Sequence, residues 1–453
     1  MIASAVVEVE GVSIVSVRPG RPAPGEDVVD LGQKLLAPAF VNAHTHLALS
    51  SFRGLGGSEA YRGNVVEELY FRVEALMDAD DVRAFVRVAA TECLLSGTAV
   101  VWDHYYHADA VIAGLRDVGL SAVMAPTLQD LSGPGVGQCE AQIEATLRIA
   151  GDDGLHADGI VAALGPHATD TVSDRLWQRV GLLAEENDLP VHAHVAQSID
   201  EFERSMEWHG ETPLGRLGSL GLLGGEHAFL LVHGLYVNEA DLKSLAPERH
   251  VLGYCPYSQI QFAFPAHIRA WRDAGVPLAL GTDAGCCNDT MNVQQELRGL
   301  ASGNAFAVSA SEPYRAFLEA PDGGGARAVQ EHRQISYDHA ASFAAPSQLL
   351  SSVWGTAGQL HPRLRTGEIS SGMRANLLVL DLDHPSLWPA TDPLRSLVLS
   401  EISPAIVGMM VNGSWRGELG DFQRSILGSD DHREALTEAK GRLKALLNRA
   451  GLA

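Results

Sequence analysis

Short, almost continuously apolar segments recur along this chain, and they constrain its fold more than any other feature. Eight of them occur between residues 36 and 280, each bounded by turn residues. A strand with one solvated face alternates apolar and polar residues, whereas a strand buried on both faces is apolar throughout. The segments therefore predict buried strands of a parallel sheet over residues 36–43, 98–102, 121–127, 160–164, 190–195, 229–232, 251–254 and 277–280.

The stretches between these segments have the apolar spacing that is typical of helices. Two examples cover residues 80–96 and 174–187, and Ser173 and Asn238 are placed to cap the helices that follow them. Eight strands that alternate with helices predict an α/β fold, a (β/α)8 TIM-like barrel. An open, doubly wound parallel sheet is the alternative, because it shows the same alternation.

Residues 1–33 instead alternate apolar and polar residues, as antiparallel strands do, and further strand-like segments follow past residue 365. We expect residues 1–36 and 366–425 to form one small composite β-sandwich domain, in which residues 374–381 and 405–413 are strands. The barrel would then cover residues 37–365. Residues 426–453 are predicted to form a C-terminal helix, because residues 430–448 are amphipathic.

The composition limits the possible partners. The 453 residues are 46% hydrophobic and carry a formal net charge of −23 at pH 7. Such an acidic chain is poorly suited to nucleic acid or anionic membranes, so we expect a small-molecule substrate. The five cysteines show no Cys-x-x-Cys spacing, which argues against a disulfide framework or a thiolate zinc site. The first residues lack the features of a signal peptide and no apolar stretch is long enough to span a membrane, so a cytoplasmic protein is predicted.

Histidine and aspartate recur where the predicted strands end. In a parallel barrel the C-terminal strand ends meet at one rim, and catalytic residues lie there. His44 and His46 would share one face of the first strand, because residues i and i+2 of a strand point the same way. The further residues of this kind are Asp103, His104, His167, His192, His194, His233 and Asp283. Imidazoles and carboxylates are the usual ligands of a catalytic zinc ion, which lowers the pKa of a bound water, so the pattern indicates a metal-dependent hydrolase.

These motifs resemble those of the amidohydrolase superfamily, in the branch that holds methylthioadenosine/S-adenosylhomocysteine deaminases, guanine and 8-oxoguanine deaminases and triazine hydrolases. The resemblance covers nearly the whole chain and rests on residues 38–46, 166–168, 192–197, 232–234, 255–258 and 280–284. It implies that one divalent metal ion, by default zinc and alternatively iron, is bound by His44, His46, His194 and Asp283. Asp283 would also be the general base, and His233 would orient the attacking hydroxide.

The resemblance also implies which residues contact the substrate. His167 follows the fourth strand and would contact the substrate directly. His104 and Tyr257 are further candidates, for which packing is an equally good explanation. His192 is expected to pack in the core, since the family's ligand on that strand is the second histidine. Relatives often form dimers or larger assemblies, so we expect a homo-oligomer.

Gln197 departs from the family pattern. Deaminases of this branch usually read His-x-x-Glu at the fifth strand, and the Glu passes protons to the ring and to departing ammonia; this chain reads His194-Val195-Ala196-Gln197. A glutamine at a catalytic position can hydrogen-bond the substrate but cannot exchange a proton. Either Asp283 and His233 handle every proton, or Asp200 or Glu201 reaches the site, or the protein is inactive.

Metal-dependent deamination of an aromatic N-heterocycle by metal-bound hydroxide is therefore the first expectation. Hydrolysis of a urea or amide C–N bond is the second, because Gln197 suits a substrate with a carbonyl or amide edge. Dechlorination of a triazine-like ring is the third. A ligand-binding barrel without catalysis is the alternative outside the enzymes.

Overall fold

The computed structural model describes residue 2 and residues 4–55, 65–261, 267–309, 312–320, 325–343 and 345–452. Parallel strands at its centre follow one another in chain order and pair with their neighbours. These strands are β4 (Phe40–His46), β5 (Thr98–Tyr105), β6 (Ser121–Leu128), β7 (Ile160–Ala162) with β8 (Gly165–Pro166), β9 (Val191–Val195), β10 (Phe229–His233), β11 (His250–Tyr254), and β12 (Leu278–Leu280) with β13 (Asp283–Ala284).

Two junctions close these strands into a ring. β13 pairs in parallel with β4, which places Asp283 beside Thr45 and Ala284 beside His46. Leu164, between β7 and β8, forms a parallel bridge with Val191 of β9. An open sheet would leave its first and last strands unpaired. The predicted (β/α)8 barrel is therefore confirmed, and the doubly wound alternative is wrong.

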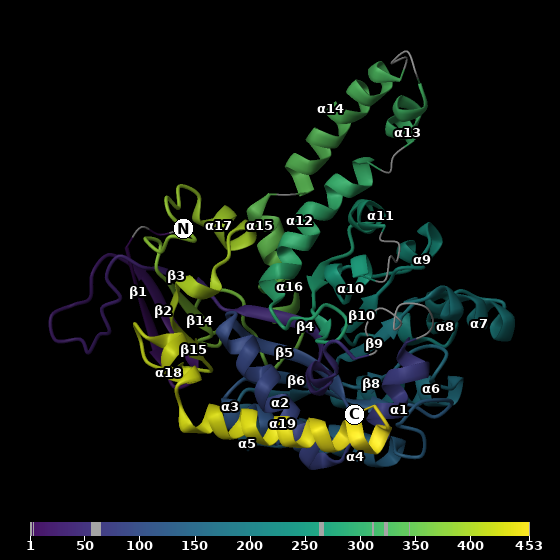
Figure 1. Cartoon of the computed structure of the whole chain (residues 1–453), viewed down its shortest axis with the longest axis horizontal. Helices are drawn as coiled ribbons and strands as arrows, with labels where there is room; N and C mark the ends of the chain where they lie inside the picture. The colour runs from purple at the N-terminus through teal and green to yellow at the C-terminus, as the bar shows by residue number, and fades with distance from the viewer. Residues whose placement is uncertain are drawn as a thin grey trace.

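Helices connect the strands and cover the barrel from outside (Figure 1). The predicted caps are present: the Ser173 side chain accepts from the backbone of Leu176, and that of Asn238 from Ala240 and Asp241. The elements up to β12 are η1 (Leu47–Phe52), η3 (Val66–Tyr70), α1 (Phe71–Glu74), α2 (Ala79–Leu95), α3 (Ala108–Val118), α4 (Cys139–Ala150), α5 (Asp153–Ala157), α6 (Asp174–Asn187), α7 (Ile199–His209), α8 (Pro213–Ser219), η4 (Leu222–Gly224), α9 (Glu239–Lys243), α10 (Pro256–Gln261) and α11 (Ile268–Asp273).

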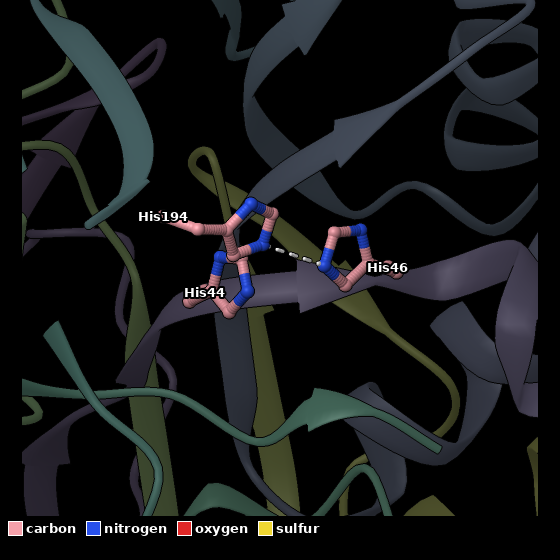
Figure 2. A group of neighbouring side chains, drawn as sticks. All are labelled: His44, His46 and His194. Carbon is pink, nitrogen blue, oxygen red and sulfur yellow. Dashed lines mark hydrogen bonds between the residues drawn. The ribbon is translucent and has the colours of Figure 1, made fainter. Parts of the chain in front are cut away.

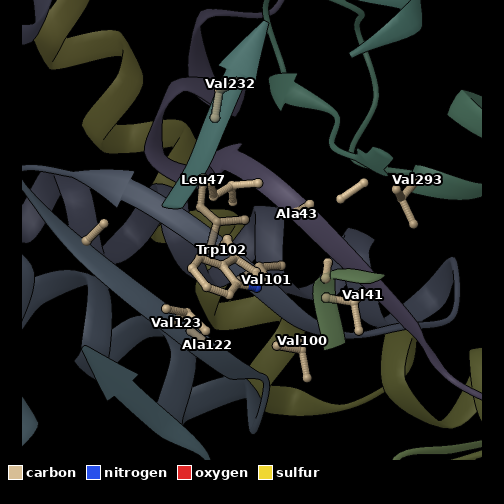
Figure 3. Packing of buried hydrophobic residues seen from close by; sticks show 14 of the residues in the cluster. Val41, Ala43, Leu47, Val100, Val101, Trp102, Ala122, Val123, Val232 and Val293 are labelled. Atoms are coloured by element: carbon tan, nitrogen blue, oxygen red, sulfur yellow. The ribbon is translucent and has the colours of Figure 1, made fainter. Parts of the chain in front are cut away.

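The apolar composition of the strands reflects their burial on both sides. Every residue of β5 and of β6 is buried. Figure 3 shows Val100, Trp102 and Val123 of these strands packed with Val41 and Val232 from other strands. Burial of one aliphatic side chain of this kind stabilises a fold by about 1.5–3 kcal/mol. The barrel core is therefore a rigid support for the residues at the strand ends.

Strands from both ends of the chain form a smaller antiparallel sheet beside the barrel. Its order is β16 (Ser414–Arg416), β15 (Ile406–Val411), β14 (Leu377–Leu380) and β3 (Leu35–Pro38). A two-stranded sheet of β1 (Ala5–Glu10) and β2 (Ser13–Pro19) packs against it through Ile14, Met373, Ala375, Leu377 and Met410. The composite sandwich of the predicted fold is therefore present, while the boundaries at residues 36, 366 and 425 remain predictions.

The remaining helices lie after β13. In Figure 1, α13 (Glu312–Glu319) and α14 (Ala326–Phe343) project away from the barrel beyond α12 (Val293–Ser309). α19 (Asp430–Ala450) lies along α2, where Arg442 forms an ion pair with Asp80 at 2.7 Å. Among the described helices, none has the length and apolar character needed to cross a membrane. The other elements of this part are α15 (Pro346–Ser351), α16 (Gly355–Gly358), α17 (Pro393–Leu399), η5 (Ser403–Ala405) and α18 (Phe422–Leu427).

Candidate active site

Two histidines at the end of β4 project to the same face of the strand, because one residue separates them. The intervening Thr45 donates through Oγ1 to the carboxylate of Asp103 at 2.8 Å. The same carboxylate oxygen accepts from the backbone N–H of Leu47 at 2.7 Å. Asp103, at the end of the neighbouring strand, therefore fixes the strand end that carries His44 and His46.

His194 of β9 adds a third imidazole to this rim of the barrel. The candidate ligand atoms of His44, His46 and His194 all lie within 4.8 Å of one another. The closest pair is Nε2 of His46 and Nε2 of His194, 3.2 Å apart, and Figure 2 shows the three rings gathered around one point. The closed barrel thus brings together residues that are 150 positions apart in the sequence.

Hydrogen bonds on the far side of the rings determine which nitrogen is protonated. His46 Nδ1 lies 2.6 Å from the carbonyl oxygen of His104, and His194 Nδ1 lies 2.8 Å from that of His167. A carbonyl oxygen only accepts, so both Nδ1 atoms donate and both Nε2 atoms present a lone pair. Two lone pairs 3.2 Å apart repel each other unless a positive charge lies between them. The arrangement therefore fits a divalent cation bound through Nε2.

His44 completes this donor set from deeper in the barrel. Its side chain is fully buried, and its Nε2 has no hydrogen-bond partner among the described residues. Burial lowers the pKa of His46 and of His194 to about 4, and it lowers the pKa of His44 well below its usual value. All three rings are therefore neutral near pH 7, which is the form that binds a metal ion.

Asp283 places a carboxylate beside His44 and His46 of this cluster. Its Oδ1 lies 3.8 Å from Nε2 of His44 and 3.8 Å from Nε2 of His46, while its Oδ2 accepts from Ser258 at 2.9 Å. Asp283 has a φ of +59°, a strained backbone conformation that is seen mostly at functional sites. Gly281 permits the close approach of the two strands, because a Cβ there would lie 2.6 Å from the backbone nitrogen of His44.

His233, the last residue of β10, packs directly on this cluster. Its ring stacks on that of His194 with centroids 5.4 Å apart and meets His44 edge-on at 5.7 Å. The residue is fully buried, and burial lowers the pKa of its imidazole well below the usual value. His233 is therefore a neutral imidazole beside the group formed by His44, His46, His194 and Asp283.

A cavity of about 250 Å³ opens onto the cluster at the C-terminal ends of the strands. Its walls include His46, His194 and Asp283 together with three residues predicted to contact substrate, namely His104, His167 and Gln197. His104 Nδ1 pairs with Thr127 Oγ1 at 2.9 Å, and His167 Nδ1 pairs with Thr171 Oγ1 at 2.9 Å. These partners fix both rings and leave Nε2 of each as the atom available to a ligand.

Tyr257, the fourth predicted substrate contact, lies elsewhere in the described structure. It is the second residue of α10, and its backbone N–H donates to Glu296 at 2.9 Å. A Cβ placed on Gly299 of α12 would lie 3.1 Å from the Tyr257 ring, so the ring packs towards that helix. Tyr257 is not among the described residues that line the cavity.

The turn after β9 shows what surrounds Gln197. The carboxylate of Glu201 accepts from the backbone N–H groups of Ala196 at 3.0 Å and Gln197 at 2.7 Å, and from Thr169 Oγ1 at 2.6 Å. Glu201 therefore holds the turn in shape with both of its oxygens. Asp200 also lines the cavity. Of Asp200 and Glu201, the two acids that the sequence suggests as able to reach the site, Asp200 is the one that does not hold this turn.

Three residues of the site escaped the sequence reasoning. His192, expected only to pack, places Nε2 2.8 Å from His44 Nδ1, and the repeated His-x-His spacing on β9 was the available signal. Ser258 orients Asp283. Glu74 of α1 is a buried wall residue whose pKa burial raises to about 7. No motif marks Glu74, because its helix returns to the cavity only in the folded chain.

Comparison with known proteins identifies the family to which the chain belongs. The sequence profile of the amidohydrolase family matches residues 35–416. The 5-methylthioadenosine/S-adenosylhomocysteine deaminase of Halobacterium salinarum is 29% identical over 377 residues, which cover 82% of this chain and 79% of that protein.

Solved structures share the fold. A zinc-bound adenosine deaminase from Xanthomonas campestris has a TM-score of 0.78 at 24% identity, over 98% of this chain and 94% of its own. The atrazine chlorohydrolase of Arthrobacter aurescens TC1, complexed with zinc, has a TM-score of 0.78 at 18% identity, over 97% of this chain and 95% of its own.

Proposed function

Because the chain belongs to the amidohydrolase family, we propose that it is a divalent-metal-dependent aminohydrolase that removes an amino group from an aromatic N-heterocycle. One observation carries the proposal: the Nε2 atoms of His46 and His194 face each other beside His44 and the Asp283 carboxylate, at the end of a cavity. The relatives named as deaminases support deamination over urea or amide hydrolysis, dechlorination or ligand binding alone.

In this proposal His44, His46, His194 and Asp283 hold the cation. Nitrogen and oxygen ligands suit zinc, which similar folds also bind, so zinc is the proposed metal. A divalent cation held there supplies Lewis acidity, which lowers the pKa of water at the site. His192 positions His44 by accepting a hydrogen bond from its Nδ1.

Asp283 is the proposed general base and acid. Its carboxylate takes a proton from the attacking water and returns that proton to the amino group as ammonia leaves. Ser258 holds the side chain in place by donating to Oδ2, which leaves Oδ1 directed at the histidines. His233 lies beside the same atoms, where its imidazole orients the water and stabilises the charge that develops on the tetrahedral intermediate.

The substrate ring would occupy the cavity between His167, His104 and Gln197. Nε2 of each imidazole is available for a hydrogen bond, and the carboxamide of Gln197 offers both a donor and an acceptor. Gln197 fixes the ring without exchanging a proton, so the proton that the leaving group needs comes from Asp283. An inactive protein is not expected, because the donor set and the cavity are both complete.

Metal analysis and a substrate panel on one sample test the proposal. We expect about one equivalent of divalent metal and ammonia release from amino-substituted purines, pyrimidines or triazines. Asp283→Asn should lower the rate by about 10²–10⁴-fold, the usual contribution of general acid–base catalysis. Stoichiometric metal with no ammonia released from any heterocycle would overturn it, as would turnover confined to ureas and amides.

The proposal also covers the protein's location, partners, oligomeric state and domains. We propose a cytoplasmic enzyme that acts on a small molecule as a homo-oligomer and has no role in binding nucleic acid. The net charge of −23 supports the last point, since it opposes approach to a polyanion. The barrel over residues 37–365 and the composite domain of residues 1–36 and 366–425 are the proposed domains.

A further inference from the structure

A second group of possible metal ligands lies next to the first. The ligand atoms of His233, Cys255 and Asp283 lie within 4.8 Å of one another, and all three residues are buried. They come from successive strand ends: His233 ends β10, Cys255 directly follows β11, and Asp283 begins β13. The barrel therefore holds these three donors in fixed positions.

Asp283, which the proposed function places among the ligands of the first cation, is also a member of the second group. One carboxylate oxygen faces His44 and His46 at 3.8 Å, and the other accepts from Ser258. A carboxylate with two oxygens is able to bridge two cations, which in two-metal sites lie about 3.5–4 Å apart. The second group therefore adjoins the proposed catalytic metal and is not a remote surface site.

The donor set of the second group has its own selectivity. It consists of one imidazole, one thiol and one carboxylate, and a thiolate ligand favours thiophilic ions such as zinc and cadmium over magnesium or calcium. A cysteine binds a metal ion as the thiolate, whereas a thiol is ordinarily protonated at pH 7. When a cation binds, the S–H bond breaks, a sulfur–metal bond forms and the proton passes to the solvent.

We propose that His233, Cys255 and Asp283 form a second, inhibitory site for a thiophilic divalent cation. A cation at this site binds the imidazole of His233 and the carboxylate of Asp283. These are the two side chains that orient water and move the proton in the proposed reaction, so the inhibition, though not the binding, rests on the proposed function. Activity should therefore rise with the first equivalent of zinc and fall as a thiophilic cation is added beyond it.

Cadmium is the probe, because a cadmium–thiolate bond absorbs in the ultraviolet where zinc is silent. Protein loaded with one equivalent of zinc is titrated with cadmium, and absorbance, proton release and ammonia production are followed together. We expect a thiolate band that saturates with one further equivalent of cadmium, about one proton released per cadmium at pH 7, and parallel loss of activity.

Cys255→Ala is the test variant, and Cys255→Ser is a second variant of nearly the same size in case the first fails to fold. Each should lose the saturable band and need at least about 10-fold more cadmium for half inhibition, in line with the usual effect of impairing a metal site. Cys93→Ala is the matched control, because Cys93 is an equally buried thiol on α2, outside this group. Its band and its inhibition should match those of the wild type.

Two outcomes would overturn the site. One is a thiolate band that persists in both Cys255 variants, for example one that is lost instead in Cys287→Ala, since Cys287 lies near Asp283 and Cys255. The other is the absence of any band in the wild type. The absorbance and proton release do not depend on turnover, so they decide the site even if no heterocycle is deaminated.

Discussion

His192 tests whether hydrogen bonds behind the metal ligands contribute to metal binding. Its Nε2 lies 2.8 Å from His44 Nδ1, and its fully buried ring packs edge-on against Trp102 with centroids 5.8 Å apart. When His44 binds a cation through Nε2, its Nδ1 carries a proton, and His192 Nε2 is the acceptor for that proton. We predict that His192→Phe, which keeps a flat ring but removes the acceptor, weakens metal binding.

The geometry sets the size of the effect. Loss of a hydrogen bond behind a metal ligand usually lowers metal affinity by about 10–100-fold, or about 1.4–2.8 kcal/mol. In the variant, the buried Nδ1–H of His44 would have no acceptor, and an unsatisfied donor of this kind costs about 1–3 kcal/mol. These two values for the lost free energy of metal binding agree. His192→Gln is the matched control, because its amide oxygen is able to accept from the same N–H.

Competition with a chelator of known affinity measures the dissociation constant of zinc for the wild type and both variants. We expect His192→Phe to bind zinc about 10–100-fold more weakly and His192→Gln to stay within about threefold of the wild type. Melting of the metal-free proteins reports packing separately. Unchanged zinc affinity in His192→Phe, together with a lower melting temperature, would show that His192 only packs and would refute the reasoning.

Three further predictions concern the proton relay, a buried acid and a helix cap. Gln197→Glu should raise kcat/KM, measured as ammonia release, by up to about 10²-fold for heterocycles that need ring protonation. An unchanged rate would show that no proton donor is needed at position 197. Burial raises the pKa of Glu74 from 4.5 to about 7. The folded protein thus binds this proton more tightly than the unfolded chain, so stability should fall by up to about 3 kcal/mol between pH 4.5 and 7. Urea unfolding should show a smaller fall in Glu74→Gln, and an identical fall would contradict the assignment. Ser173→Ala should lower the free energy of unfolding by about 1 kcal/mol through loss of the α6 cap, with unchanged metal content; an unchanged urea midpoint would contradict this.

The sequence was most informative where a local pattern determines the geometry. A strand alternates its side chains whatever surrounds it, so His44 and His46 had to share a face. Continuous apolar runs predicted the buried strands because a parallel barrel covers both of their faces. The barrel brings His194 and Asp283 to the same rim as the first two histidines, since every strand end of that fold lies there. Their selection among the other strand-end candidates rested on the family resemblance.

Features set by tertiary packing could not be predicted in the same way. Glu74 lines the cavity from α1, and no local spacing in the sequence encodes that position. Tyr257 follows a strand end yet packs towards Gly299, because the direction of the short helix α10 decides where its ring lies. The sequence marks Glu201 only as an acid that is able to reach the site, because its hydrogen bonds to the turn after β9 and to Thr169 depend on the folded backbone.

The acids around Gln197 are largely engaged in other interactions. Both oxygens of Glu201 accept from the turn after β9. Asp170 pairs with Arg204 at 2.9 Å, and Glu74 hydrogen-bonds the Tyr105 hydroxyl. Contacts in the cavity wall hold these three acids, so none of the three replaces the glutamate that the family usually has at this position. Asp200 also lines the cavity and is not held in this way, so it is the alternative proton carrier.

In the proposed mechanism, Asp283 is the carboxylate on which proton transfer depends. It faces two of the cluster imidazoles, and Ser258 holds its second oxygen, so its orientation hardly changes during a turnover. One carboxylate that first accepts and then returns the same proton is sufficient when the leaving amine is protonated after water has attacked. The reaction then needs no second acid at position 197, where a glutamine that only hydrogen-bonds is able to select the ring. We therefore expect slow turnover of a substrate whose ring must be protonated before water attacks it. This expectation distinguishes the enzyme from relatives that have glutamate at position 197.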